Sequence, residues 1–213
     1  LNYMDLKQQC RQANLDLVTQ GLVLFTWGNA SLFDRVENVM LIKPSGVDYD
    51  QLTADKIVAV RVADGSLVNP IGLKPSSDTA THLALYRAWP GVHGIVHTHS
   101  DHCTALACLN EPLPAFHYMV LQFGGPDVRC APYVTFGTPE LATISIAAMA
   151  GRTACLLANH GMIAAGPDLD AAVAAAHLLE QLARQYLLAR AAGVPRILSA
   201  AECTAAQRRF TTY

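Results

Sequence analysis

Two short apolar stretches followed at once by a long helical segment restrict the fold more than any other feature of the sequence. Residues 152–166, RTACLLANHGMIAAG, predict a strand, a turn and a second strand. Residues 169–195 predict a long helix that ends at Gly193 and Pro195. Strands of this kind bury their apolar residues against a covering layer of helices. The sequence therefore predicts a mixed α/β fold.

The remaining segments extend this pattern along the chain. Further helices are predicted at residues 5–21, 76–91 and 100–110. Further β structure is predicted at residues 39–46, 57–68 and 94–98. Ser77 or Asp78 would cap the second of these helices, and Asp64-Gly65 would form the turn of the hairpin at 57–68. We find no linker or repeat, so we expect one domain spanning residues 1–213, with helices packed on a central sheet.

Composition excludes several classes of partner. The chain has 213 residues, of which 52% are apolar and 15% charged, so a sizeable core is expected. The formal net charge is −2 and no Lys/Arg cluster is present, which argues against nucleic acid and anionic membranes as partners. No apolar run approaches the roughly 20 residues that span a bilayer.

The six cysteines and the first residues indicate a compartment. No C-x-x-C pair occurs, so a thiolate zinc site is not indicated, and buried free thiols fit better than disulfides in a chain this apolar. The first ten residues lack the basic start and apolar core of a signal peptide. We therefore expect a protein of the reducing cytoplasm.

The stretch GIVHTHSDH, which begins at Gly94, carries the main candidate for chemistry. Residues i and i+2 of a strand point to the same face, so His97 and His99 would converge, as ligands of a divalent metal such as zinc do. His160, after the apolar stretch ACLLA, and Asp78 would complete a mixed nitrogen and oxygen site. Hydrogen-bonded core histidines and a capping Asp78 are the structural alternatives. A carboxylate displaced from the metal would be free to act as a base.

Three loops, FTWGNAS, KPSGVD and KPSSD, have the composition of anion-binding loops. Hydroxyls, loop N–H groups and a helix N-terminus suit a phosphate group, and Lys precedes Pro-Ser twice, at Lys43 and Lys74. Each loop alone is also ordinary turn chemistry. No Walker A or G-x-G-x-x-G pattern occurs, so a nucleotide cofactor is not indicated. The candidate phosphate-binding residues are Thr26, Gly28, Asn29, Ser45, Gly46, Ser76 and Ser77.

Taken in order, TWGNAS, KPSG, KPSSDTATH, HTHSDH, FHYM and ANHGM resemble the class II aldolase/epimerase family, which also includes the adducin-like domains. The resemblance runs from about Thr26 to the C-terminal helix. It implies an α/β/α sandwich around a mainly antiparallel sheet, a C4 homotetramer and a phosphorylated ketose as substrate. It also implies one Zn²⁺ per subunit on three histidines, and Mn²⁺ or Co²⁺ would suit such a site as well.

The resemblance also assigns roles to individual residues. His97, His99 and His160 match the zinc histidines, and Asp78 matches the acidic ligand and base. The seven loop residues given above match the phosphate-binding loops. Tyr118 and Tyr213 match two active-site tyrosines of the fuculose-phosphate aldolase branch, where they exchange a proton with the aldehyde oxygen.

The two halves of the chain resemble different branches of the family. Asp78 is typical of the ribulose-phosphate epimerase branch, since the fuculose-phosphate aldolase has Glu there. The later half, from LPAFHYMVLQFGG onward, resembles the aldolase, and Gln122 stands where the epimerase has an essential Asp. An amide cannot carry a proton at neutral pH, so we expect an aldolase that releases dihydroxyacetone phosphate and a small aldehyde. The alternatives are an epimerase, a dehydratase or decarboxylase, and a non-catalytic adducin-like interaction domain.

Overall fold

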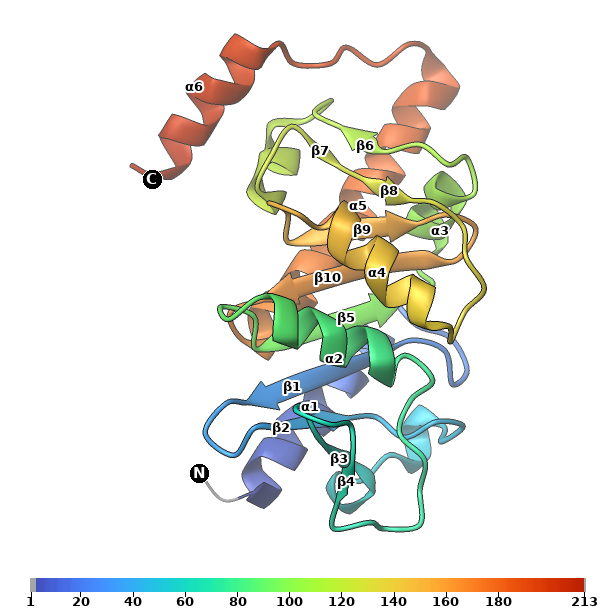
Figure 1. The fold of residues 1–213 in the computed structure, drawn as a ribbon. Helices are drawn as coiled ribbons and strands as arrows, with labels where there is room; N and C mark the ends of the chain where they lie inside the picture. Colours follow the sequence, from blue (N-terminus) through green and yellow to red (C-terminus); the bar gives the residue numbers. More distant parts are fainter. Residues whose placement is uncertain (1–2, 213) are drawn as a thin grey trace.

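A computed structural model describes residues 3–212, and an eight-stranded sheet forms its centre (Figure 1). The strand order is β4-β3-β2-β1-β5-β10-β9-β8, and every neighbouring pair is antiparallel except β8 with β9. The strands of this sheet are β1 (Asn29–Asp34), β2 (Val39–Ile42), β3 (Val58–Arg61), β4 (Leu67–Val68), β5 (Gly94–Thr98), β8 (Cys130–Ala131), β9 (Ala154–Leu157) and β10 (Gly161–Gly166). A separate antiparallel pair is formed by β6 (Leu113–Pro114) and β7 (Asp127–Val128). The mainly antiparallel sheet expected from the sequence is confirmed.

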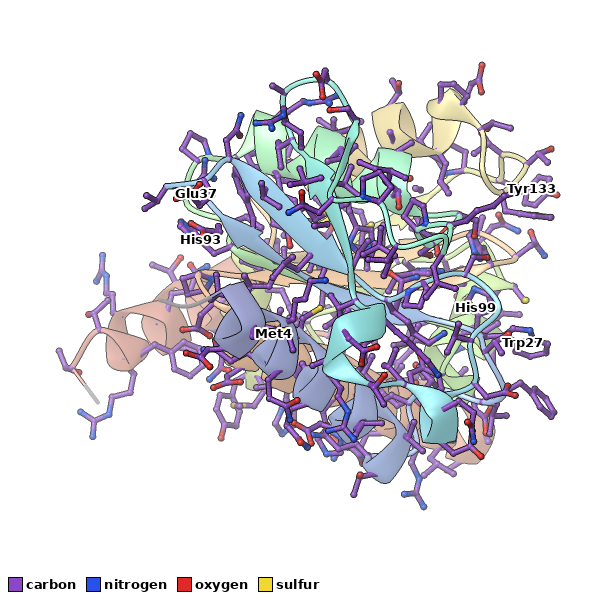
Figure 2. All side chains as sticks on the ribbon, turned by 90° about the horizontal axis from the view of Figure 1, so that it is seen from below. Met4, Trp27, Glu37, His93, His99 and Tyr133 are labelled. Atoms are coloured by element: carbon purple, nitrogen blue, oxygen red, sulfur yellow. The ribbon has the colours of Figure 1, made fainter. Side chains whose placement is uncertain are left out.

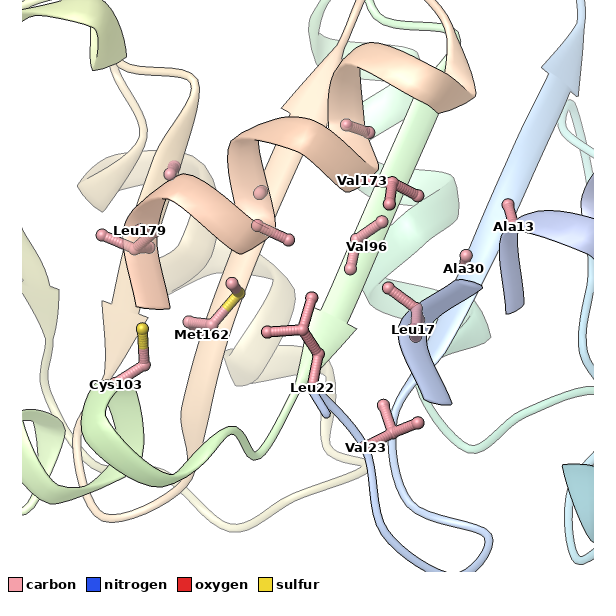
Figure 3. Close-up of a cluster of buried hydrophobic side chains, with 14 of the residues drawn as sticks. Ala13, Leu17, Leu22, Val23, Ala30, Val96, Cys103, Met162, Val173 and Leu179 are labelled. Carbon is pink, nitrogen blue, oxygen red and sulfur yellow. The ribbon is translucent and has the colours of Figure 1, made fainter. Parts of the chain in front are cut away.

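Helices cover both faces of this sheet. The helices are α1 (Tyr3–Thr19), α2 (Thr79–Ala88), α3 (Asp101–Ala107), α4 (Pro139–Ala148), α5 (Leu169–Ala192) and α6 (Ala200–Phe210), with 3₁₀ turns η1 (Tyr49–Gln51), η2 (Ala54–Lys56) and η3 (Tyr118–Phe123). Successive residues of β2 point to opposite faces: Leu41 joins the core under α1, α3 and α5, whereas Met40 joins the core under α2 and α4. Figure 3 shows part of the first core, where Leu17, Leu22 and Met162 lie between helices and sheet. The α/β/α sandwich is therefore confirmed.

Most strands and α-helices lie where the sequence predicts them, but β1, β6, β7, β8, α4 and α6 are not predicted. β1 follows directly from the loop that contains Gly28, and its start was interpreted as part of that loop. Neither α4 nor α6 was predicted. α6 lies apart from the sandwich in Figure 1 and packs on η3 through a small cluster that includes Ala115, Leu121 and Cys203. Its few apolar contacts explain why hydrophobic periodicity does not reveal it.

The cysteines and the helix lengths bear on the expected compartment and partners. All six cysteines are free thiols, and four of them are buried. Cys130 is only partly buried and Cys108 is exposed, so the expectation of buried thiols is wrong for these two residues. Within residues 3–212, no helix combines the length and the apolar character that crossing a bilayer requires.

Candidate active site

Segments that are far apart in the sequence meet at one end of the central strands β1, β5 and β10, and we call this end of the strands the sheet edge. Asn29, at the start of β1, pairs with His97 near the end of β5, and Ile163 of β10 pairs with His97 on the other side. His160 directly precedes β10. Since neighbouring strands are antiparallel, the start of one meets the end of the next at this edge. Figure 2 shows His99 and Trp27 at this side of the molecule, opposite Glu37 and His93.

Three imidazole rings converge at this edge. The Nε2 atoms of His97 and His99 are 3.1 Å apart, which confirms that the two side chains point to one face. The ring of His160 has its centroid 4.8 Å from that of His97 and 4.9 Å from that of His99. One ring nitrogen from each residue lies within 4.8 Å of the others. This convergence could hold a metal ion.

The protonation of the three histidines fits that role. His97 Nδ1 donates to the Met162 carbonyl at 2.9 Å, so its Nε2 presents a lone pair to the cluster. Burial lowers the pKa of His97 and of His99, and it lowers the pKa of His160 to about 4. The rings are therefore neutral at pH 7, as metal ligands must be. A set of three neutral imidazoles suits zinc and similar divalent ions.

Two glycines allow the backbone to approach this cluster. Gly28 has φ +72°, and a Cβ atom there would lie 2.9 Å from the His97 carbonyl oxygen. At Gly161 a Cβ atom would lie 2.3 Å from the Thr98 carbonyl oxygen and 3.0 Å from the His99 ring. Any larger residue at either position would push apart the segments that carry the histidines.

Asp78 lies beside the cluster in a polar network. It occupies the N-cap position of α2, but its side chain makes no capping hydrogen bond, so the capping prediction is wrong for its carboxylate. Its Oδ2 instead accepts from Asn29 Nδ2 at 2.7 Å and from Ser76 Oγ at 3.3 Å, and lies 4.0 Å from His97 Nε2. Burial alone would raise the pKa of Asp78, but the imidazoles of His97 and His82 and the Asn29 amide hold it below the usual value. Asp78 is therefore a carboxylate that lies 4.0 Å from the nearest nitrogen of His97.

The two Lys-Pro-Ser loops pair with each other. Pro44 and Pro75 form an isolated antiparallel bridge. On either side of it, Ser45 N donates to the Lys74 carbonyl at 2.9 Å and Ser76 N donates to the Lys43 carbonyl at 3.1 Å. The repeat that the sequence shows is thus a structural pair, which brings the serines of both loops to one place.

All these groups line one cavity of about 330 Å³. Four further residues line this cavity and have no predicted site role: Trp27, Lys43, Pro44 and Phe136. Lys43 is buried, and its Nζ lies 4.6 Å from the centre of the Tyr49 ring and donates to the Thr26 carbonyl at 3.3 Å. Burial lowers the pKa of Lys43 to about 8, so the cation persists at pH 7. The predicted residues on this cavity are His97, His99, His160, Asp78, Thr26, Gly28, Asn29, Ser45, Gly46, Ser76 and Ser77.

Tyr118 is not among the residues that line this cavity. It is half exposed at the start of η3, stacks on His117 with ring centroids 4.7 Å apart, and lies 6.0 Å from the ring of Phe210 in α6. It lines a second cavity of about 510 Å³, together with Gln122 and Arg209. Tyr213, the other predicted tyrosine, lies outside the described residues. One chain therefore brings together the predicted metal and phosphate residues without Tyr118.

Glu180 of α5 anchors the segment that follows the histidine pair. Its buried carboxylate accepts from the backbone N–H groups of His102 and Cys103, both at 2.9 Å, and contacts His102 Nδ1 at 2.6 Å. Burial alone would raise the pKa of Glu180, but these hydrogen bonds hold it below the usual value. Glu180 thus fixes the start of α3, two residues beyond His99. The sequence gives no signal for this role, because Glu180 looks like a surface residue of a long helix.

Comparison with known proteins agrees with this geometry. An L-fuculose phosphate aldolase from Escherichia coli O6:H1 is 40% identical over 209 residues, which is 98% of this chain and 95% of that protein. A 5-methylthioribulose-1-phosphate/5-deoxyribulose-1-phosphate aldolase from Rhodospirillum rubrum is 44% identical and covers 92% of this chain and 87% of its own length. The L-ribulose-5-phosphate 4-epimerase UlaF of Salmonella paratyphi C is 38% identical, over 87% of this chain and 85% of its own length.

Solved structures and family models give the same result. A structure of L-fuculose 1-phosphate aldolase superposes with a TM-score of 0.91 at 39% identity, covering 97% of this chain and 96% of that one. The model of the class II aldolase and adducin N-terminal domain matches residues 8–187. That match includes every residue that lines the cavity at the sheet edge. The chain belongs to the class II aldolase and adducin N-terminal domain family.

Proposed function

We propose that this chain is a metal-dependent aldolase that cleaves a ketose 1-phosphate into dihydroxyacetone phosphate and a small aldehyde. One observation carries the proposal: three convergent imidazoles, a carboxylate and a cradle of hydroxyls share a single cavity. Names among the relatives, which include fuculose phosphate and methylthioribulose phosphate aldolases, support a phosphorylated ketose. A cavity of about 330 Å³ is of the size that binds small ligands.

His97, His99 and His160 would hold the ion, and zinc is the ion we propose, with Mn²⁺ or Co²⁺ as possible replacements. A divalent cation at this position supplies positive charge beside the substrate oxygen that turns negative as the carbon–carbon bond breaks. The His97 ring would contribute a lone pair of fixed direction, since its Nδ1 is bonded to the Met162 carbonyl.

The phosphate group would lie at the other end of the cavity, between the two paired loops. Ser45, Ser76 and Ser77 offer hydroxyls, and the Lys43 ammonium gives the cradle a buried positive charge. Thr26, Gly28, Asn29 and Gly46 complete this part of the lining. Binding the phosphate at a fixed distance from the histidines would orient the reacting carbons at the cluster.

Asp78 would move the proton of the reaction. It lies between the two ends of the cavity, and its hydrogen bonds to Asn29 and Ser76 connect it to the phosphate cradle. We propose that it is the fourth ligand before substrate binds, and that substrate frees it to exchange a proton with the carbon next to the carbonyl. Asp78→Asn should lower kcat by about 10²–10⁴-fold with the fold intact. An unchanged kcat would remove Asp78 from this role.

The predicted catalytic tyrosines would have to come from a second copy of the chain. Tyr118 lines a different cavity from the histidines, so a Tyr118 that exchanges a proton with the aldehyde oxygen must come from a neighbouring subunit. We therefore propose a homotetramer of the C4 type, in which Tyr118 and Tyr213 of one protomer complete the cavity of the next. We place this enzyme in the cytoplasm, which its six free thiols support.

A panel of ketose phosphates tests the reaction. The purified, zinc-loaded protein is incubated with fuculose 1-phosphate, 5-deoxy- and methylthio-ribulose 1-phosphates and ribulose 5-phosphate, and triose phosphate is measured with a coupled dehydrogenase. Release of dihydroxyacetone phosphate supports the aldolase. Exchange between two pentulose 5-phosphates without triose release supports the epimerase, the alternative favoured by the UlaF relative and by the Asp at position 78.

A further inference from the structure

A buried chain of polar groups lies directly beneath Asp78. His82, one helical turn further along α2, is fully buried, and its Nδ1 is 2.7 Å from Ser31 Oγ. Ser31 Oγ is in turn 2.8 Å from the Tyr86 hydroxyl, which also lies 2.8 Å from the Ser31 carbonyl oxygen. Although His82 Nε2 is buried, it has no hydrogen-bond partner among residues 3–212.

One arrangement of protons satisfies all three contacts. The Ser31 carbonyl can only accept, so the Tyr86 hydroxyl donates its single proton there. The contact between Ser31 Oγ and Tyr86 must then be donated by Ser31. The Ser31 hydroxyl, having used its proton, accepts from His82 Nδ1–H. With its Nδ1–H bonded to Ser31, the neutral His82 ring presents Nε2 as a bare acceptor.

The position of this acceptor identifies its partner. A small space is lined by His82, Asp78 and His97 together with four apolar or hydroxyl side chains. His97 cannot donate to His82, since its Nδ1–H is bonded to the Met162 carbonyl and its Nε2 faces the histidine cluster. A buried acceptor without a partner costs free energy, because it has lost its hydrogen bonds to water. That cost is recovered when Asp78 carries a proton and turns toward His82.

We propose that His82 is a positioning residue that accepts a hydrogen bond from Asp78 while Asp78 holds the proton it exchanges with substrate. This inference rests on the proposed function of Asp78. The proton passes between the substrate carbon next to the carbonyl and an Asp78 oxygen, and His82 binds it without removing it from Asp78. Ser31 and Tyr86 fix the tautomer that makes this possible.

Nitrogen NMR of the metal-free protein, labelled with ¹⁵N at histidine, tests the tautomer without any turnover. His82 should carry its proton on Nδ1 and show the signal of a bare Nε2. In Asp78→Asn the amide N–H imitates the protonated acid, so the Nε2 signal should move toward its hydrogen-bonded position, whereas in Asp78→Ala it should stay. An Nε2–H tautomer in the unmodified protein, or the same signal in both variants, overturns the proposal. Because no substrate is present, this result is independent of whether the protein is an aldolase.

Kinetics test the consequence with the loaded enzyme. His82→Asn keeps an amide near the Nδ1 position, where it can bond Ser31, but has no atom at the Nε2 position. It should lower kcat about 10-fold or more, with KM and bound metal unchanged. His82→Gln places a carbonyl oxygen near the Nε2 position and should recover part of kcat. Leu83→Met, a volume-conserving change at the adjacent buried residue of α2, should leave kcat unchanged. Full kcat in His82→Asn, or a joint loss of kcat, KM and metal in both His82 variants, overturns the proposal.

Discussion

The sheet edge and the η3–α6 region, each of which carries predicted catalytic residues, are built in different ways. The sheet edge takes its geometry from strand register: Asn29 and Ile163 flank His97 on paired strands, and His160 precedes β10. The η3–α6 region lies outside the main sheet. Its η3 turn contributes Val120 and Phe123 to the core under α1, α3 and α5, whereas α6 packs on a small cluster of three buried residues, Ala115, Leu121 and Cys203, with a few partly buried neighbours. Strand register brings the histidines together within one chain. Tyr118, in contrast, lines a different cavity from the histidines.

The difference in packing has energetic consequences. The sheet edge is continuous with two large cores, one on each face of the sheet. Regions with few buried apolar contacts open at lower free energy than the global unfolding. Within the η3–α6 region, α6 therefore has the smaller resistance to local opening.

The largest effect is expected at the sheet edge. His97→Ala removes a ligand from the centre of the cluster, so we expect loss of bound zinc and a fall in kcat of at least about 10³-fold. Metal content by elemental analysis and triose phosphate release measure the two effects. His93→Ala, at the opposite side of the molecule in Figure 2, is the matched control and should keep both. Retained zinc with full activity in His97→Ala would refute the ligand assignment.

Tyr118→Phe tests the second region, the one that contains η3 and α6. We expect zinc content to be unchanged and kcat to fall by about 10²-fold, because a proton donor is lost and no ligand is. The decisive measurement mixes this variant with His97→Ala under conditions that exchange subunits. A site with intact histidines from one protomer and Tyr118 from the other should recover activity. Mixed oligomers that stay as inactive as the separate variants would place the two regions in independent sites.

Sequence patterns predicted the sheet edge well for a physical reason. His97 and His99 follow from the two-residue period of a strand, and the long helix and its flanking strands follow from apolar periodicity. The resemblance to a family added the assembly of distant loops into one site, which no local pattern contains. That the Lys-Pro-Ser loops pair through Pro44 and Pro75 could not be derived, because a bridge between distant loops leaves no periodicity.

Residues that act through a buried partner were missed. Glu180 and His82 each sit on a helix whose pattern accounts for them as ordinary positions, and only the fold shows that one holds α3 and the other lies beneath Asp78. Capping of α2, the structural alternative for Asp78, is not what its side chain does: it bonds Asn29, because the buried amide of β1 competes for it. Tertiary hydrogen bonds of this kind override local capping preferences.

Glu180→Gln tests whether the sheet edge depends on a residue outside the cavity, because Glu180 holds the start of α3, which follows His99. The amide replaces one of two acceptor oxygens by a donor, which faces the N–H groups at the start of α3. We expect zinc affinity to fall by about 10- to 100-fold through a loosened His99, as for other residues that orient ligands. Competition with a chelator measures it. Glu111→Gln, on an exposed ion pair with Arg190, is the control and should not change the affinity; an equal loss in both variants would contradict the role of Glu180.

The smallest expected effect is a fall in the free energy of unfolding at low pH. The pKa of His82 is about 3 in the folded chain, because of burial, and about 6.5 when unfolded. Below pH 6.5 the unfolded chain takes up a proton that the folded chain refuses, so the free energy of unfolding of the metal-free protein falls as pH drops from 6.5 toward 3. The slope from His82 alone is about 1.4 kcal/mol per pH unit.

Urea unfolding at several pH values, with hydrogen exchange read by element, separates the two regions. His82→Asn should flatten the pH slope by the amount due to one proton. Amides of α2 and β5, which surround the buried imidazoles, should lose protection in acid in step with the global unfolding. Those of α6, whose cluster contains no histidine, should exchange at a free energy that acid changes little. If α6 and α2 instead lose protection together with the same pH dependence, the two regions form one cooperative unit, and the independence inferred from their packing is wrong.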